Sequence, residues 1–147
     1  MRILRVVRVW NFAAVILLLV YLSWRLLRAA DYRELAQRVG YNGPQRTFPI
    51  AHFRERAPTG ARARDVWFRM TGYDKVEYFL VPIVGTKDSV LVQQFCYPMR
   101  LEHLEVEIEY KGGVVSDIEV SGEKRAEART ITPYEAFARL GWKPHDK

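Results

Sequence analysis

The residues with the clearest chemical pattern are carboxylates on two neighbouring segments near the C-terminus. They alternate with apolar side chains, and they are Glu105, Glu107, Glu109, Asp117 and Glu119. Because successive side chains of a strand point to opposite faces, this spacing predicts two strands with one acidic and one apolar face. Grouped carboxylates can bind cationic side chains or a hard cation such as calcium, or they can remain solvated with no ligand.

The two acidic segments are joined by residues 111–113, a glycine-rich loop that predicts an antiparallel hairpin. In the register that a three-residue loop imposes, Glu107 lies opposite Asp117. Like charges directly opposite each other destabilise a sheet, so we expect a compensating charge. We interpret the carboxylates as a partner-docking surface. The alternatives are full solvation, neutralisation by arginines of residues 54–64, and a bound cation.

No catalytic arrangement is expected. Cys96 and His103 could act as nucleophile and base, but they straddle Pro98, and the sequence identifies neither an orienting acid nor oxyanion donors. A lone cysteine on a strand is more often a small buried apolar residue. The sequence contains no phosphate-binding glycine loop, nucleophile elbow or zinc motif. We therefore expect a non-catalytic protein without a cofactor or a metal site.

A second charged group lies in an irregular, arginine-rich segment. Residues 41–64 contain Pro44, Pro49, Pro58 and Gly60 without sustained periodicity, which predicts a tether or a surface loop. Its arginines could be solvated, contact anionic lipid headgroups, or dock on an acidic protein surface. The arginines assigned to lipid or acidic-partner contact are Arg54, Arg56, Arg62 and Arg64.

The N-terminus contains one long apolar stretch, residues 9–27. As a helix it would span roughly 28 Å, close to the hydrocarbon thickness of a bilayer. Arginines flank it and no acid precedes Asp31, which disfavours a buried core helix. Aromatic and basic side chains near its ends fit the membrane interface. They are Arg8, Trp10, Tyr21, Trp24 and Arg25.

A cleaved signal peptide also begins with basic residues and an apolar run, but Arg28 stands where a cleavage site needs a small residue. The sequence therefore predicts a retained signal anchor that crosses an inner membrane, bacterial or organellar, once. Arginines are balanced on the two sides of the stretch, so they do not set the orientation. Translocation of the downstream domain favours the extracytoplasmic or periplasmic side for that domain.

The charge distribution bears on the partners. The net charge of +6 comes from 23 Lys and Arg against 17 Asp and Glu, and arginines around the apolar stretch account for most of the excess. The rest of the chain is nearly neutral as a whole. It is basic close to the apolar stretch of residues 9–27 and acidic farther along. A nucleic-acid reader would carry a basic patch on its folded domain, so no nucleic acid is expected. The expected partners are the lipid bilayer and another membrane protein or complex.

After the anchor the sequence predicts an α+β domain. Asp31 and Glu34 have the spacing of a capping box, which predicts a short helix, or a continuation of the anchor, ending near Gly40. Short runs rich in β-branched and aromatic residues then predict an antiparallel meander of about five strands. These runs are 66–70, 76–84, 90–97, 104–110 and 114–120. Pro82 lies inside its run and indicates an edge or a bulge.

A C-terminal helix has the best local signals. Thr132 is a favoured N-cap, Pro133 fits the first helical position, Glu135 completes the capping pattern, and Gly141 is a stop. The predicted length is about two turns. The side chains expected to cover the sheet are Tyr134, Phe137 and Ala138.

These elements divide the chain into an anchor over residues 1–30, a short helix and Arg-rich linker over 31–65, and a β domain with a C-terminal helix over 66–147. The combination favours an anchored accessory or assembly subunit that docks onto a membrane-protein complex. The alternative is a tethered domain that binds a small apolar ligand or lipid between sheet and helix. Phe79, Phe95 and Phe137 would line such a pocket, whereas a filled core would favour the subunit.

Overall fold

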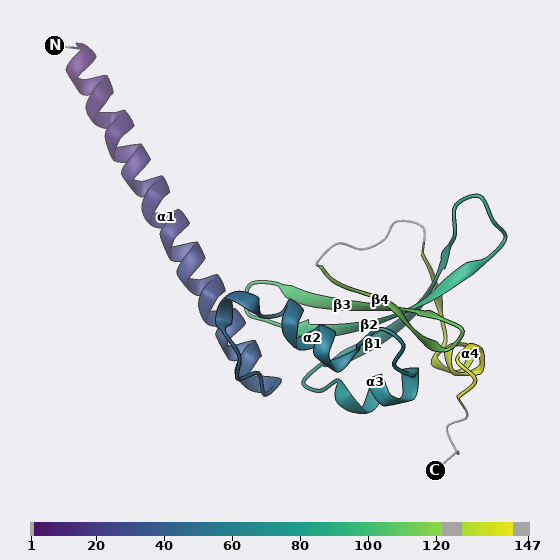
Figure 1. The fold of residues 1–147 in the computed structure, drawn as a ribbon. Coiled ribbons are helices and arrows are strands. Elements are labelled where there is room, and N and C mark those ends of the chain that lie inside the picture. The colour runs from purple at the N-terminus through teal and green to yellow at the C-terminus, as the bar shows by residue number, and fades with distance from the viewer. Residues whose placement is uncertain (1, 122–127, 143–147) are drawn as a thin grey trace.

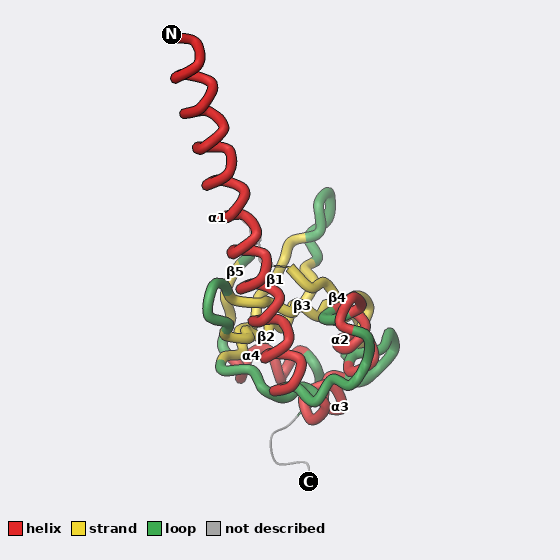
Figure 2. Tube along the Cα trace, turned by 90° about the vertical axis from the view of Figure 1, so that its left-hand side faces the viewer, coloured by secondary structure: helices red, strands yellow, loops and turns green. Residues whose placement is uncertain are grey.

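The first helix projects far from the rest of the molecule. The computed structural model of the protein describes residues 2–121 and 128–142 (Figure 1). Helix α1 runs without interruption over Arg2–Arg38, and both Figure 1 and Figure 2 show its N-terminal part standing clear of the domain. It is long and apolar enough to cross a membrane, with a mean hydropathy of 1.8 over a window in which no residue is buried. Its exposed apolar surface excludes the role of a core helix.

The last turns of α1 belong to the domain core. Leu35, Ala36 and Val39 are buried there. Of the two expected alternatives, a separate short helix and a continuation of the anchor, the structure has the continuation, and the Asp31 carboxylate accepts a hydrogen bond from Leu101 N instead of capping a new helix. The predicted stop at Gly40 is confirmed. This glycine has φ +72°, and Tyr41 N donates to Ala36 O, which is the Schellman pattern of a helix end.

The predicted α+β class, with an antiparallel sheet and a C-terminal helix, is confirmed. The described residues form a five-stranded sheet of order β4-β3-β2-β1-β5. The strands are β1 (Lys75–Pro82), β2 (Ser89–Pro98), β3 (His103–Lys111), β4 (Val114–Ser121) and β5 (Arg129–Ile131). The first four form a meander, and β5 returns to the outer edge of β1. It pairs only with residues 78–80, so Pro82 lies where that edge of β1 is unpaired, as its missing N–H requires.

The predicted strand over residues 66–70 is wrong. This stretch lies in helix α3 (Ala63–Arg69). Its β-branched and aromatic composition suggested a strand, but the buried residues Ala63, Val66 and Met70 follow the three- and four-residue spacing of a helix. That helical spacing can be recognised only when the residues before Val66 are considered together with residues 66–70.

The predicted register of the acidic hairpin is also wrong. Gly112 and Gly113, with φ +61° and +80°, form a two-residue turn between Lys111 and Val114, and a bulge follows at Glu109/Tyr110. Paired positions near the middle of the hairpin are therefore displaced by two residues from those expected for a three-residue loop. A register shift of two residues keeps each side chain on the face where it was expected, because side chains alternate between faces with a period of two.

Helices cover one face of the sheet. These are the end of α1, the short 3-10 turn η1 (Gln45–Thr47), α2 (Ile50–Arg56), α3 and α4 (Pro133–Arg139). Phe53 of α2 lies against Tyr97 of β2 with ring centroids 4.9 Å apart, and both side chains are buried. The segment predicted as a tether or surface loop thus forms helices that contribute buried side chains to the core.

The C-terminal helix begins as predicted. Thr132 Oγ1 accepts a hydrogen bond from Glu135 N at 3.2 Å, and Pro133 occupies the first turn. Its covering face differs from the prediction, because Tyr134 and Ala138 are exposed and Ala136 is buried. Phe137 lies edge-on to Tyr78 and Trp67 and so closes this end of the core.

Candidate functional site

The predicted carboxylates lie together on the face of the sheet opposite to the helices. Strand β3 supplies Glu105, Glu107 and Glu109, and the adjacent strand β4 supplies Asp117 and Glu119. Alternation places the apolar partners Val106 and Ile108 on the covered face, where both are fully buried. The expectation that these acids share one face agrees with the observed pairing.

Like charges remain opposite each other in the observed register. Glu107 is paired with Glu119, and Glu109 is paired with Asp117. Asp117 and Glu119 are exposed, whereas Glu107 is 3% exposed. Burial of a carboxylate requires hydrogen bonds to its oxygens.

Gln94 of β2 supplies part of this hydrogen bonding. Its Nε2 donates to Glu105 Oε2 at 3.0 Å and to Glu107 Oε1 at 3.1 Å, so one amide group links two carboxylates. Its other polar atom, Oε1, is buried, and no donor among residues 2–121 and 128–142 bonds to it. Because Gln94 is only 1% exposed, its carbonyl is a buried acceptor that a donor from a ligand or partner could satisfy.

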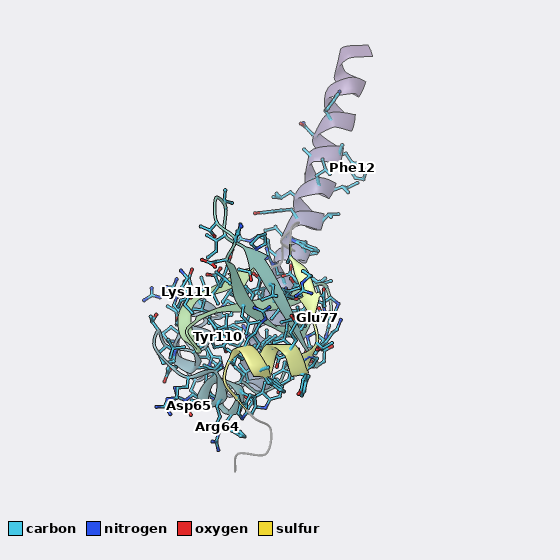
Figure 3. The ribbon with its side chains drawn as sticks, turned by 90° about the vertical axis from the view of Figure 1, so that its right-hand side faces the viewer. Phe12, Arg64, Asp65, Glu77, Tyr110 and Lys111 are labelled. Carbon is cyan, nitrogen blue, oxygen red and sulfur yellow. The ribbon has the colours of Figure 1, made fainter. Side chains whose placement is uncertain are left out.

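A hollow of about 200 Å³ adjoins Gln94 on this face. Its walls combine apolar side chains of β1 and β2 with two carboxylates; they include Glu77, Phe79, Val81, Val92, Gln94 and Glu107. Figure 3 shows Glu77 at the edge of the domain near the base of the projecting helix. A long side chain with an apolar stem and a cationic end matches this lining.

The thiol of Cys96 lies on the same face but has no activating group. Burial, followed by the nearby carboxylates of Glu105 and Glu77, raises its pKa. The thiol is therefore protonated at neutral pH and is a poor nucleophile. His103 begins β3 opposite Pro98 and is exposed. Within residues 2–121 and 128–142, no group of three or more His, Cys, Asp or Glu side chains is arranged to hold a metal ion.

Of the four arginines proposed for lipid or acidic contacts, Arg54 and Arg56 lie on α2 and Arg64 lies on α3, whereas Arg62 forms a bridge with Val114 at the edge of β4. Arg54, Arg62 and Arg64 are exposed, and Arg56 Nη1 donates to Arg69 O at 2.8 Å, which links α2 to α3. In the described part of the chain, none of them forms an ion pair with an acid of the opposite face. Neutralisation of that face by residues 54–64 is therefore wrong, because Arg54, Arg56 and Arg64 lie on the helices of the other face and Arg62 lies at the edge of β4.

The position of Arg64 also bears on the lipid interpretation. Figure 3 shows Arg64 and Asp65 at the end of the domain opposite to the projecting helix. A bilayer crossed by α1 would lie beyond the other end, so this position does not favour contact between Arg64 and lipid.

Most of the predicted membrane-interface residues are exposed on α1. The exposed side chains along the projecting helix include Trp10, Tyr21, Trp24 and Arg25. The Arg25 guanidinium lies 5.9 Å from the centre of the Tyr21 ring. The side chain of Arg8 lies outside the described part of the structure.

The three phenylalanines proposed to line an apolar pocket are not brought together. Phe95 and Phe137 lie on the covered face, where Trp67 fills the space between them at ring-centroid distances of 6.3 and 6.2 Å. Phe79 points to the opposite face, because it neighbours Tyr78 on β1. The pocket expected between sheet and helix is thus occupied by aromatic side chains.

Sequence reasoning did not identify Gln94 or Glu77 as site residues. The signal for Gln94 was present, because Gln93 and Gln94 interrupt an otherwise apolar central strand. A buried amide in such a strand has to find partners across the sheet. Glu77 carries no such signal, since its role depends on the neighbours that β2 and β5 bring to it.

Comparison with protein-family models, with curated proteins and with solved structures finds no match for this chain.

Proposed function

We propose that this protein is a non-catalytic, membrane-anchored accessory or assembly subunit whose acidic sheet face docks onto another membrane protein. The observation that carries this proposal is the helix-free face with its grouped carboxylates, its hollow and the buried, unsatisfied carbonyl of Gln94. A basic side chain of a partner would enter the hollow, donate to Gln94 Oε1 and meet the carboxylates around it.

Anchoring by α1 supports the docking role. The helix presents a continuous apolar surface with no internal partner, and its last turns are built into the core. A bilayer would cover that surface, and it would also confine the domain to the plane where membrane proteins are found. We place the anchor in a bacterial or organellar inner membrane, with the domain on the extracytoplasmic side.

The proposal is tested by crosslinking in membranes of the source cells. A photo-reactive residue replaces Glu119 on the acidic face, and a second variant carries it at Phe68, which is 68% exposed on α3. We expect a discrete crosslinked adduct from position 119 and none from position 68. Mass spectrometry of the adduct then identifies the partner and the residues that face the site.

The matched variant is Glu105→Gln, Glu107→Gln and Asp117→Asn combined. Removing like charges from neighbouring strands lowers their repulsion, so we expect it to melt at the same temperature as the wild type or higher. Its adduct from position 119 should be lost. A triple variant that melts higher and still forms the same adduct would show that the acidic face is not the docking surface.

A further inference from the structure

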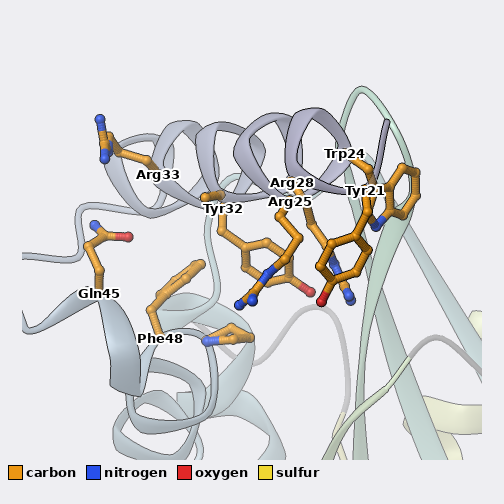
Figure 4. A pocket seen from close by; sticks show the side chains of 10 residues that line it. Tyr21, Trp24, Arg25, Arg28, Tyr32, Arg33, Gln45 and Phe48 are labelled. Atoms are coloured by element: carbon orange, nitrogen blue, oxygen red, sulfur yellow. The ribbon is translucent and has the colours of Figure 1, made fainter. Parts of the chain in front are cut away.

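A second, larger hollow lies where the projecting helix meets the domain. It has a volume of about 700 Å³ and separates the last exposed turns of α1 from the segment that follows η1 (Figure 4). Aromatic rings and guanidinium groups line it. The residues that matter here are Tyr21, Trp24, Arg25, Arg28, Arg33 and Phe48.

The chemistry of this hollow is cationic. Figure 4 shows the side chains of Arg25 and Arg28 extending from the helix toward the Phe48 segment. Arg28 Nε donates to Glu102 Oε1 at 3.0 Å, and the Arg28 guanidinium also interacts with the side chain of Tyr32. Within the described residues, Arg25 and Arg33 form no ion pair. In the described part of the chain the Glu102 carboxylate pairs only with Arg28, so the guanidinium groups that line the hollow leave an excess of positive charge, which favours an anion.

Aromatic rings hold two of these guanidinium groups in place. Arg25 lies 5.9 Å from the centre of the Tyr21 ring, and Arg28 lies 5.7 Å from the centre of the Tyr32 ring. Such cation–π contacts restrict the arginine side chains before a ligand arrives. A planar guanidinium can donate two parallel hydrogen bonds to a phosphate, so the pair suits a phosphate group better than a single point charge would.

The position of the hollow indicates the source of the phosphate. On one side lies the exposed apolar surface of α1, and on the other lies the first contact of the helix with the domain, where Asp31 bonds Leu101 N. In an anchored protein this is the level of the lipid headgroups, and Tyr21 and Trp24 are the residue types that prefer that level. Acyl chains of a lipid held here would lie along exposed side chains such as Leu17 and Leu22.

We propose that this hollow binds the headgroup of an anionic phospholipid, with its phosphate between Arg25 and Arg28 and its acyl chains along α1. The inference rests on the proposed anchoring of α1 in a bilayer. It assigns the hollow to a specific lipid neighbour rather than to solvent, and it gives the arginines at this end of the helix a ligand.

The test uses the full-length protein in a mild detergent that contains equal amounts of phosphatidylglycerol and phosphatidylcholine. Native mass spectrometry counts the lipids that remain bound. We expect the wild type to retain one phosphatidylglycerol in preference to phosphatidylcholine. The variant Arg25→Gln/Arg28→Gln should retain phosphatidylglycerol on the order of tenfold less, since each cation near an anionic headgroup contributes several-fold to binding.

A matched control is Arg69→Gln/Lys111→Gln, which removes the same charge from exposed side chains outside the hollow. It should retain phosphatidylglycerol like the wild type. Equal losses in both variants, or no preference for phosphatidylglycerol in the wild type, would overturn the proposal. Excess inorganic phosphate should not displace the lipid, because the acyl chains also contribute; displacement by phosphate would reassign the hollow to a soluble anion.

Failure of the lipid site can be told apart from failure of the anchor. Alkaline carbonate washing of membranes reports anchoring alone. A wild type released into the aqueous fraction would overturn the anchored function and this proposal together. If the wild type and both variants stay in the membrane pellet but retain the same amount of lipid, the lipid site is overturned. The anchor is then still supported.

Discussion

Asp31 Oδ2 accepts a hydrogen bond from Leu101 N at 3.0 Å, and this bond joins the long helix to the loop between β2 and β3. Two ion pairs flank it, Arg28 with Glu102 at 3.0 Å and Arg100 with Glu34 at 2.8 Å. The Arg38 side chain adds a bond to Pro98 O at 2.6 Å. The loop and the end of β2 thus receive contacts from four residues spread over about three turns of α1, which sets the direction in which the helix leaves the domain.

Removing the Asp31 carboxylate should destabilise this joint. In Asp31→Ala the half-buried Leu101 N–H loses its charged acceptor, and we expect the free energy of unfolding to fall by about 1–2 kcal/mol. Asp31→Asn keeps an acceptor oxygen and should lose less. Chemical denaturation of the detergent-solubilised protein measures both. Equal stability of Asp31→Ala and the wild type would mean that the contact carries no net energy.

Replacement of Phe53 tests whether the segment between α1 and the sheet is part of the core. Phe53 is 1% exposed and lies against Tyr97, so Phe53→Ala should lower the free energy of unfolding by about 3–5 kcal/mol. Phe68 on α3 is the control, because its exposed ring should contribute less than about 0.5 kcal/mol. Denaturant midpoints compare the two variants. If Phe53→Ala lowers the free energy of unfolding only slightly, the segment between α1 and the sheet is a tether and not part of the core.

His52 should make stability depend on pH. Burial, and next the charge of Arg56, lowers the pKa of its imidazole below the ordinary 6.5. The folded state therefore favours neutral histidine, whereas the unfolded chain takes up a proton as the pH falls below 6.5. The free energy of unfolding should decrease from pH 7 downward and level off below the pKa of the folded state.

The matched variant for this pH effect is His52→Gln. Carboxylates also titrate at low pH, so the informative quantity is the difference between the two stability curves. We expect the curves to converge as the pH falls from 7, because only the wild type loses stability by protonating position 52. Parallel curves between pH 7 and 5 would show that His52 does not titrate differently in the two states.

The buried amide of Gln93 links two tyrosines inside the covered face. Tyr110 Oη donates to Gln93 Oε1 at 2.7 Å, and Gln93 Nε2 donates to Tyr78 Oη at 3.2 Å. Gln93→Leu would leave both hydroxyls buried without this partner, at a cost on the order of 1–3 kcal/mol for each. Adding Tyr78→Phe and Tyr110→Phe to Gln93→Leu should recover most of that loss. Thermal melts compare the two variants, and no recovery would contradict the network.

Local patterns in the chain were enough for several elements. The apolar run of residues 9–27 predicted the exposed helix, because length and hydropathy are properties of a single segment. The alternation around Glu107 predicted which residues share a face, since a strand has a period of two whatever it pairs with. The cap at Thr132 was predicted correctly because its hydrogen bond closes within four residues.

Features that depend on distant residues were predicted less well. The turn at Gly112 and Gly113 and its bulge set the pairing of the acidic strands, and the resulting two-residue shift in register leaves the alternation of faces unchanged. The strand expected at residues 66–70 became a helix because Val66 and Met70 meet a core formed by α1 and the sheet. Asp31 showed a capping pattern, yet its partner proved to be Leu101.

Both candidate sites arise from such distant contacts. Gln94 gains its chemistry from Glu105 and Glu107, which β3 brings beside it, and the cationic hollow forms because the Phe48 segment folds back toward Arg25 and Arg28. Residue types and periods along the chain specify what each segment can do. Which segments meet depends on burial summed over the whole core, a quantity that no short stretch of sequence contains.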